Sequence, residues 1–165
     1  MNTRFSFFGM LLLLIFVLTA CPYSAEFPLD APNQKISAGL LGEWVEKSDS
    51  ENPSYFVITK DGEQFYKFVQ HDYDSNEKEY NKKVYKAHVT KLGNVDFLNL
   101  QDASDEKFYF FKLEKEANGQ SFKLFEVTDN IDETFKTSAE MKAFFDKHKA
   151  LSFFYNKDEK TYNKR

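Results

Sequence analysis

The sequence predicts a mainly β protein, an antiparallel domain of short strands with one α-helix near its C-terminus. From residue 36 onward, apolar and polar side chains alternate with period two in short runs, as half-buried strands require. Dipeptides that favour tight hairpin turns, Asp61-Gly62 and Asn118-Gly119, separate some of these runs. A capping-box pattern that begins at Thr137 marks the start of a helix.

The first twenty residues have the three parts of a secretory signal peptide. Arg4 is the positive charge, residues 5–17 are mostly apolar, and Thr19-Ala20 supplies the small residues before a cleavage site. Together with the cysteine that follows, Leu18-Thr19-Ala20-Cys21 resembles the lipobox of bacterial lipoproteins. That resemblance implies cleavage before Cys21 and acylation of its sulfur with a fatty acid such as palmitate. It also implies an exported protein, lipid-anchored in the cell membrane or in an outer membrane.

An uncleaved transmembrane anchor is the alternative interpretation of this N-terminal segment. Residues 5–21 approach the roughly 17-residue minimum for a helix that spans a bilayer. A spanning helix rarely ends on small residues followed by cysteine and proline, so we favour the signal peptide. Under either interpretation the rest of the chain is tethered to a membrane.

The chain divides into three predicted parts: residues 1–20 as signal peptide, residues 21–35 as lipidated N-terminus and linker, and residues 36–165 as one β-barrel domain. Three of the four prolines fall within the linker, which has no repeated apolar spacing. An extended, polyproline-like segment of about 14 residues reaches roughly 40 Å. We therefore expect a tether that holds the domain clear of the membrane.

Charge and cysteine content exclude several classes of protein. Because Arg4 is the only charged residue among residues 1–20, its removal lowers the basic count from 22 to 21, against 26 acidic residues. An acidic chain with scattered lysines has no electrostatic surface for nucleic acid or for anionic head groups. Cys21 is the only cysteine, so no disulfide forms, and a core rich in phenylalanine and tyrosine must hold the domain.

The strands follow in order after residue 36. Trp44 and its neighbours open the first, residues 55–59 alternate, and residues 63–71 return after the predicted turn at Asp61-Gly62. Further strands are expected at residues 85–89, 95–101, 107–116 and 121–128. Several of them are apolar on both faces, so both faces must be covered, or one must line an interior cavity.

One helix interrupts this pattern. Glu140 stands three residues after Thr137, and Met141, Phe144 and Phe145 follow at helical spacing, which predicts a helix over residues 138–150 with its apolar stripe on the sheet. Residues 151–156 are short, aromatic and strand-like. Residues 157–165 form either a polar tail or a last edge strand.

The segment Leu40-Leu41-Gly42-Glu43-Trp44, followed by strands in up-and-down order, resembles the opening of the lipocalins and the wider calycin barrels. This resemblance implies an antiparallel barrel of about eight strands. By the family pattern, Gly42 and Trp44 belong to a Gly-x-Trp motif in which Trp44 plugs the closed end. A basic residue near the C-terminus packs over that tryptophan in the family, and Arg165 is the arginine available for this role.

Chemical motifs are scarce. The sequence contains no phosphate loop, no nucleophile elbow and no His-Glu-x-x-His, and we expect neither an enzyme nor a cofactor. Asp72, Asp74 and Asn76 match the first positions of a calcium loop, but Glu77 and Lys83 replace the required glycine and glutamate. The three histidines lack metal-ligand spacing. The acidic residues 129–133 are interpreted as a turn before the helix.

Two functional hypotheses from different classes remain. The first is a membrane-anchored, lipocalin-like protein that binds a small apolar or lipid-like ligand inside its barrel. The second is an envelope interaction or inhibitor module, with a solid core and functional surface loops such as residues 72–77. A barrel cavity of roughly 300 Å³ or more would favour the first hypothesis.

Overall fold

A computed structural model of the chain describes residues 22–165. The predicted signal peptide, the lipobox and Cys21 lie outside these described residues. Among the residues that the structure does describe, no helix is long and apolar enough to cross a membrane.

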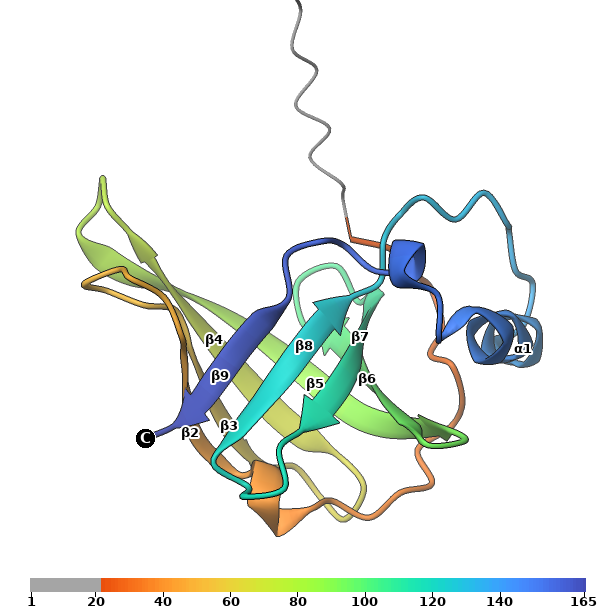
Figure 1. The fold of residues 1–165 in the computed structure, drawn as a ribbon, viewed down its shortest axis with the longest axis horizontal. Coiled ribbons are helices and arrows are strands. Elements are labelled where there is room, and N and C mark those ends of the chain that lie inside the picture. The colour runs from red at the N-terminus through yellow and green to blue at the C-terminus, as the bar shows by residue number, and fades with distance from the viewer. Residues whose placement is uncertain (1–21) are drawn as a thin grey trace, which may run out of the picture.

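Eight antiparallel strands form a closed up-and-down barrel, with one α-helix near the C-terminus, which confirms the predicted fold class (Figure 1). Neighbours in sequence are neighbours in the barrel, and the last strand pairs with the first. The barrel strands are β2 (Gly42–Glu46), β3 (Tyr55–Lys60), β4 (Tyr66–Asp74), β5 (Glu79–Leu92), β6 (Val95–Asp102), β7 (Phe108–Lys115), β8 (Ser121–Glu126) and β9 (Lys160–Lys164). The remaining elements are β1 (Ser24–Ala25), the 3-10 helices η1 (Ala38–Leu40) and η2 (Ser152–Phe154), and α1 (Ser138–His148).

Two separate apolar cores hold this fold, because several strands are apolar on both faces. The first fills one end of the barrel interior and includes Trp44, Phe68 and Phe122. The second lies on the outside of the barrel, where α1, η2 and the N-terminal segment cover β6 and β7. Phe145 of α1 is fully buried there between Phe97 and Phe110. The helix thus covers an outer face, as its apolar stripe predicted.

The helix begins as its capping box predicts. The Thr137 side chain accepts a hydrogen bond from the Glu140 backbone N–H at 3.2 Å. The Glu140 carboxylate in turn accepts a hydrogen bond from the Lys136 backbone N–H at 2.8 Å. The helix ends at His148, two residues earlier than expected. Residues 151–156 are not a strand, because η2 occupies their first half and only Tyr155 makes an isolated bridge, to Val127.

Two polar segments were harder to interpret from sequence. Half of the predicted loop at residues 72–77 is strand, since β4 runs to Asp74, and residues 75–78 form the turn before β5 begins at Glu79. The tail at residues 157–165 contains β9, which is no edge strand because it pairs with both β2 and β8. The turn after β3 is also longer than the predicted tight turn, since Lys60 pairs with Tyr66.

The N-terminal segment differs from the expected extended tether. Residues Ser24–Ala25 pair with β7 as the short strand β1, and the Leu29 side chain is completely buried. The Leu29 backbone N–H donates to Asn99 Oδ1 at 2.8 Å. The described part of the predicted linker therefore packs along the outside of the barrel, because Leu29 and Phe27 add apolar surface to the outer core.

Candidate functional site

A cavity of about 300 Å³ occupies one half of the barrel interior and opens at the end opposite Trp44. Alternation along the strands places its lining residues, since every second side chain of a barrel strand points inward. The lining consists of Pro22, Phe56, Gln70, Lys83, Tyr85, Leu100, Asp102, Tyr109, Phe111, Leu124, Glu126, Asp158, Lys160 and Tyr162.

The deeper wall of this cavity is apolar and aromatic. Leu100 of β6 and Leu124 of β8, the two strands that flank β7, are almost completely buried and belong to the interior core. The Phe56 and Tyr162 rings lie 5.0 Å apart, centroid to centroid, and Tyr162 stacks on Phe122 at 5.3 Å. These rings form a floor between the open half and the packed half around Trp44. The floor favours an apolar or aromatic group of a ligand.

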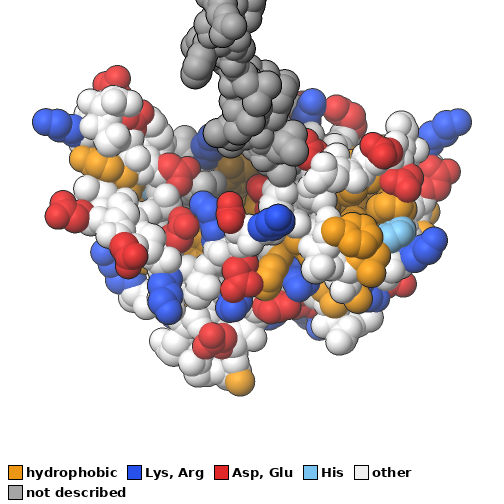
Figure 2. All heavy atoms as spheres, turned by 45° about the horizontal axis from the view of Figure 1, so that its top comes forward, with side chains coloured by type: hydrophobic (Ala, Val, Ile, Leu, Met, Phe, Trp, Pro, Cys, Tyr) orange, Lys and Arg blue, Asp and Glu red, His pale blue; other side chains and the backbone are white. Residues whose placement is uncertain are grey.

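Charged groups of both signs line the cavity nearer its mouth: two lysines, Lys83 and Lys160, and three acids, Asp102, Glu126 and Asp158. Some are already held by the protein. Asp102 Oδ1 accepts hydrogen bonds from the backbone N–H and hydroxyl of Ser104, at 2.8 and 2.7 Å. Figure 2, with this end of the barrel tilted toward the viewer, shows acidic and basic side chains interspersed over the surface.

Three tyrosines, Tyr85, Tyr109 and Tyr162, line the cavity. Burial raises the pKa of Tyr85 and of Tyr162 well above the usual range, so both hydroxyls stay protonated. Neither hydroxyl has a hydrogen-bond partner among residues 22–165, which leaves both available to a ligand. Tyr109 differs, because its hydroxyl donates to Asp105 at 2.9 Å, and burial raises its pKa to about 12.

The closed end contains the Gly-x-Trp segment. Trp44 is 2% exposed, donates its Nε1 hydrogen to the Leu40 carbonyl of η1 at 2.9 Å, and contacts the Phe122 ring. Gly42 has a φ of +127°, and a Cβ there would lie 3.3 Å from Lys164 Cε. The positive φ favours glycine, whereas the contact with Lys164 would need the lysine side chain to shift by only a few tenths of an ångström. Trp44 and Gly42 therefore belong to the closed end, away from the cavity.

The basic residue over Trp44 is Lys164, and the expectation for Arg165 is wrong. Lys164 stands opposite Trp44 in the pairing of β2 with β9 and places its Nζ 5.3 Å from the indole ring. Because side chains alternate along a strand, the next residue points away from the interior. Arg165 instead pairs with Glu43 at 2.5 Å, largely exposed.

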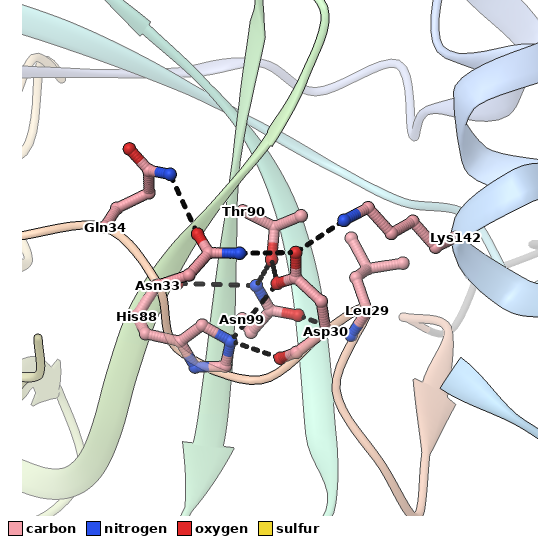
Figure 3. Close-up of polar contacts among 8 residues, drawn as sticks. All are labelled: Leu29, Asp30, Asn33, Gln34, His88, Thr90, Asn99 and Lys142. Atoms are coloured by element: carbon pink, nitrogen blue, oxygen red, sulfur yellow. Dashed lines mark hydrogen bonds and ion pairs between the residues drawn. The ribbon is translucent and has the colours of Figure 1, made fainter. Parts of the chain in front are cut away.

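A buried polar cluster on the outside of the barrel attaches the N-terminal segment and the helix (Figure 3). Asp30 accepts hydrogen bonds from the Thr90 hydroxyl and from Lys142 Nζ of α1, the latter at 2.6 Å. Asn99 Nδ2 donates to Thr90 at 2.9 Å, and His88 Nε2 donates to the Asp30 carbonyl at 3.0 Å. Every member is satisfied, as a buried polar network must be to contribute stability. We interpret this cluster as structural.

The three histidines lie apart from one another, in different surroundings. His71 stacks on Tyr55, His88 joins the polar cluster, and His148 packs on Phe144 of its own helix. No group of three histidine, cysteine, aspartate or glutamate side chains in residues 22–165 is arranged to hold a metal ion. Asp74 accepts bonds from the backbone of residues 76 and 77, so it forms the β4–β5 turn. The acidic residues 129–133 lie in the exposed loop before α1.

Comparisons with known proteins return no match, whether with protein-family models, with curated proteins or with solved structures. The cavity is therefore the feature of this chain from which a function can be inferred.

Proposed function

We propose that this chain is a lipid-anchored envelope protein whose barrel binds a small amphipathic molecule and does not catalyse a reaction. The observation that supports this proposal is the cavity of about 300 Å³ that opens opposite Trp44. Small barrels are often filled by their own side chains, and this one is filled only around Trp44. A lipobox-like segment ending at Cys21 supports the anchor.

The lining favours a ligand with an apolar body and a polar end. An apolar group fits against Leu100, Leu124 and Phe56, whereas a polar or zwitterionic end would meet the lysines and carboxylates near the mouth. Tyr85 and Tyr162 also line the cavity, and their hydroxyls can donate or accept hydrogen bonds. The volume is at the lower end of the range for ligand sites, so a long acyl chain would extend beyond the mouth.

The interaction-module hypothesis remains the alternative, because the half of the barrel around Trp44 is packed solid. Both hypotheses agree on the anchor and differ on the cavity. Only the first requires that a small molecule stabilise the fold.

Thermal unfolding with a panel of amphipathic molecules tests the proposal. A ligand present at 100 times its dissociation constant stabilises a protein by about 2.7 kcal/mol, which is visible as a higher melting temperature. Leu124→Phe provides the control, since Leu124 lines the cavity and a larger ring would fill part of it. We expect this variant to fold and to lose the ligand-dependent shift. Unchanged melting across fatty acids, isoprenoids and zwitterionic detergents would favour the interaction module.

A further inference from the structure

We propose that the open end of the barrel rests on the lipid bilayer, with Phe153 and Leu151 inserted into the interface, so that the cavity opens toward the membrane. This inference rests on the proposed lipid attachment at Cys21. It adds an orientation and a second contact with lipid, neither of which an acyl anchor by itself provides.

The chain places the predicted anchor at the mouth of the cavity. Pro22 follows Cys21 directly in the sequence, so the proposed lipid attachment is one residue from Pro22. Pro22 also lines the cavity and forms a β-bridge with Thr128. The Tyr23 backbone N–H donates to the Val127 carbonyl at 3.0 Å, which holds this segment in place. An acyl group on Cys21 would therefore begin at the rim of the barrel, with no free linker between them.

The same set of backbone contacts continues to η2. The Thr128 backbone N–H donates to the Phe154 carbonyl at 3.2 Å, so η2 lies beside the segment that bridges to Pro22. Figure 1 shows η2 next to the first described residues, at the end of the barrel away from η1. The exposed apolar residues of η2 and the predicted anchor thus share one end of the molecule.

Phe153 is the most exposed large apolar side chain among residues 22–165, at 71%, and Leu151 is 38% exposed. Their neighbour Phe154 is 3% exposed and packs against Phe145 of α1, so Phe154 fixes η2 to the outer core. The Tyr155 hydroxyl donates to the Lys149 carbonyl at 2.6 Å across the same turn. Phe153 is therefore presented on a rigid support. In Figure 2 hydrophobic side chains gather on one side of this end.

A lipid bilayer is the binding partner that best fits this surface. An apolar side chain held beside a lipid anchor enters the boundary between head groups and acyl chains without a separate association step. The exposed Lys147 and Lys157 can extend toward head groups, as lysine does at interfaces. Asp158 lines the cavity, and Asp129 follows the Thr128 that bridges to Pro22, so both oppose attraction to anionic lipid. Contact should therefore occur on zwitterionic bilayers and depend little on salt.

Fluorescent labelling of the full-length protein tests this orientation. Cys21 is the only cysteine, so Phe153→Cys introduces a single new thiol for an environment-sensitive fluorophore. Glu63→Cys is the matched control, because Glu63 is exposed in the turn after β3 at the closed end. The two labelled proteins would be compared in phosphatidylcholine vesicles that contain spin-labelled lipid. We expect most of the emission to be lost at position 153 and retained at position 63.

The number of labels per chain separates the anchor from the orientation. One label shows that the Cys21 sulfur is blocked, as acylation requires, whereas two labels would overturn the anchor and the orientation together. With one label present, equal quenching at positions 153 and 63 would overturn the orientation and leave the anchor intact. Stronger quenching at position 63 would do the same, since it would place the closed end against the membrane.

Discussion

Replacing Trp44 tests whether the closed end carries the stability of the barrel. Trp44 is buried among η1, β8 and β9, and it fills the end that Leu40 closes. We expect Trp44→Ala to lower the free energy of unfolding by about 3–5 kcal/mol, as deletions of large buried aromatics do. A single domain has about 5–15 kcal/mol of stability and this one has no disulfide, so the loss is a large share.

Trp44→Phe separates the hydrogen bond from the packing. The phenyl ring keeps contact with Phe122, but the Leu40 carbonyl loses its donor at 2.9 Å. Leaving a buried polar group unpaired costs about 1–3 kcal/mol, so this variant should be intermediate. Urea unfolding followed by far-ultraviolet circular dichroism measures both variants without relying on tryptophan emission. A loss below about 0.5 kcal/mol for Trp44→Ala, within the range of surface substitutions, would refute the plug.

Lys164 and Arg165 provide a matched pair of variants that test which basic residue supports Trp44. Removing the amine over the indole with Lys164→Met should cost about 0.5–1 kcal/mol, whereas Arg165→Ala, at an exposed ion pair, should cost less. The reverse order would mean that Arg165 supports the tryptophan after all.

Three further outcomes are expected. Cys21→Ser should abolish thioether-linked lipid, because only a thiol can be acylated there; labelling with a fatty acid measures this, and persistent label would contradict it. Asn99→Ala should release the N-terminal segment, because the buried Leu29 N–H loses its acceptor. Hydrogen exchange should then show faster amide exchange over residues 24–30. Unchanged exchange would refute the role of Asn99 in holding this segment on the barrel. Burial lowers the pKa of His88 below 6.5, so the unfolded chain binds the proton more readily. The free energy of unfolding should therefore fall as pH decreases below 6.5. His88→Gln, which can still donate to Asp30, should reduce that fall. An unchanged pH profile in this variant would show that another group causes the pH dependence.

The strands and the helix could be predicted where side-chain patterning and burial agree. Residues 55–60 alternate because one face meets the interior, and residues 97–100 are buried on both faces because the outer core covers β6. Thr137 caps the helix through contacts entirely local in sequence. The outer part of the β4–β5 hairpin was missed because it projects beyond the barrel and meets solvent, so its residues are polar. Strand β9 was ambiguous for a related reason. Only Tyr162 is buried, and its pairing partners lie up to about 120 residues away.

The candidate site could be predicted only in outline. A chain with apolar residues on both faces of its strands predicts either a cavity or a solid core, and the sequence does not distinguish them, because ring packing is a three-dimensional property. The attachment of the N-terminal segment was also missed. Its available signal was Asn99, a polar residue inside an apolar run, which must find partners once buried. Its partner, the Leu29 backbone N–H, lies 70 residues away, within a proline-containing segment interpreted as linker.

Pairing of β2 with β9 also sets the order in which the chain can fold. Trp44 pairs with Lys164, so the barrel closes only when the two ends of the domain meet. Such non-local pairing slows folding, since the entropy of closing a long loop is lost before the contacts form. Synthesis starts at the N-terminus, so the edges of β2 and β8 that pair with β9 stay unpaired until the last six residues have been made. During that interval both edges can pair with other chains, so shortening the C-terminus should favour aggregation.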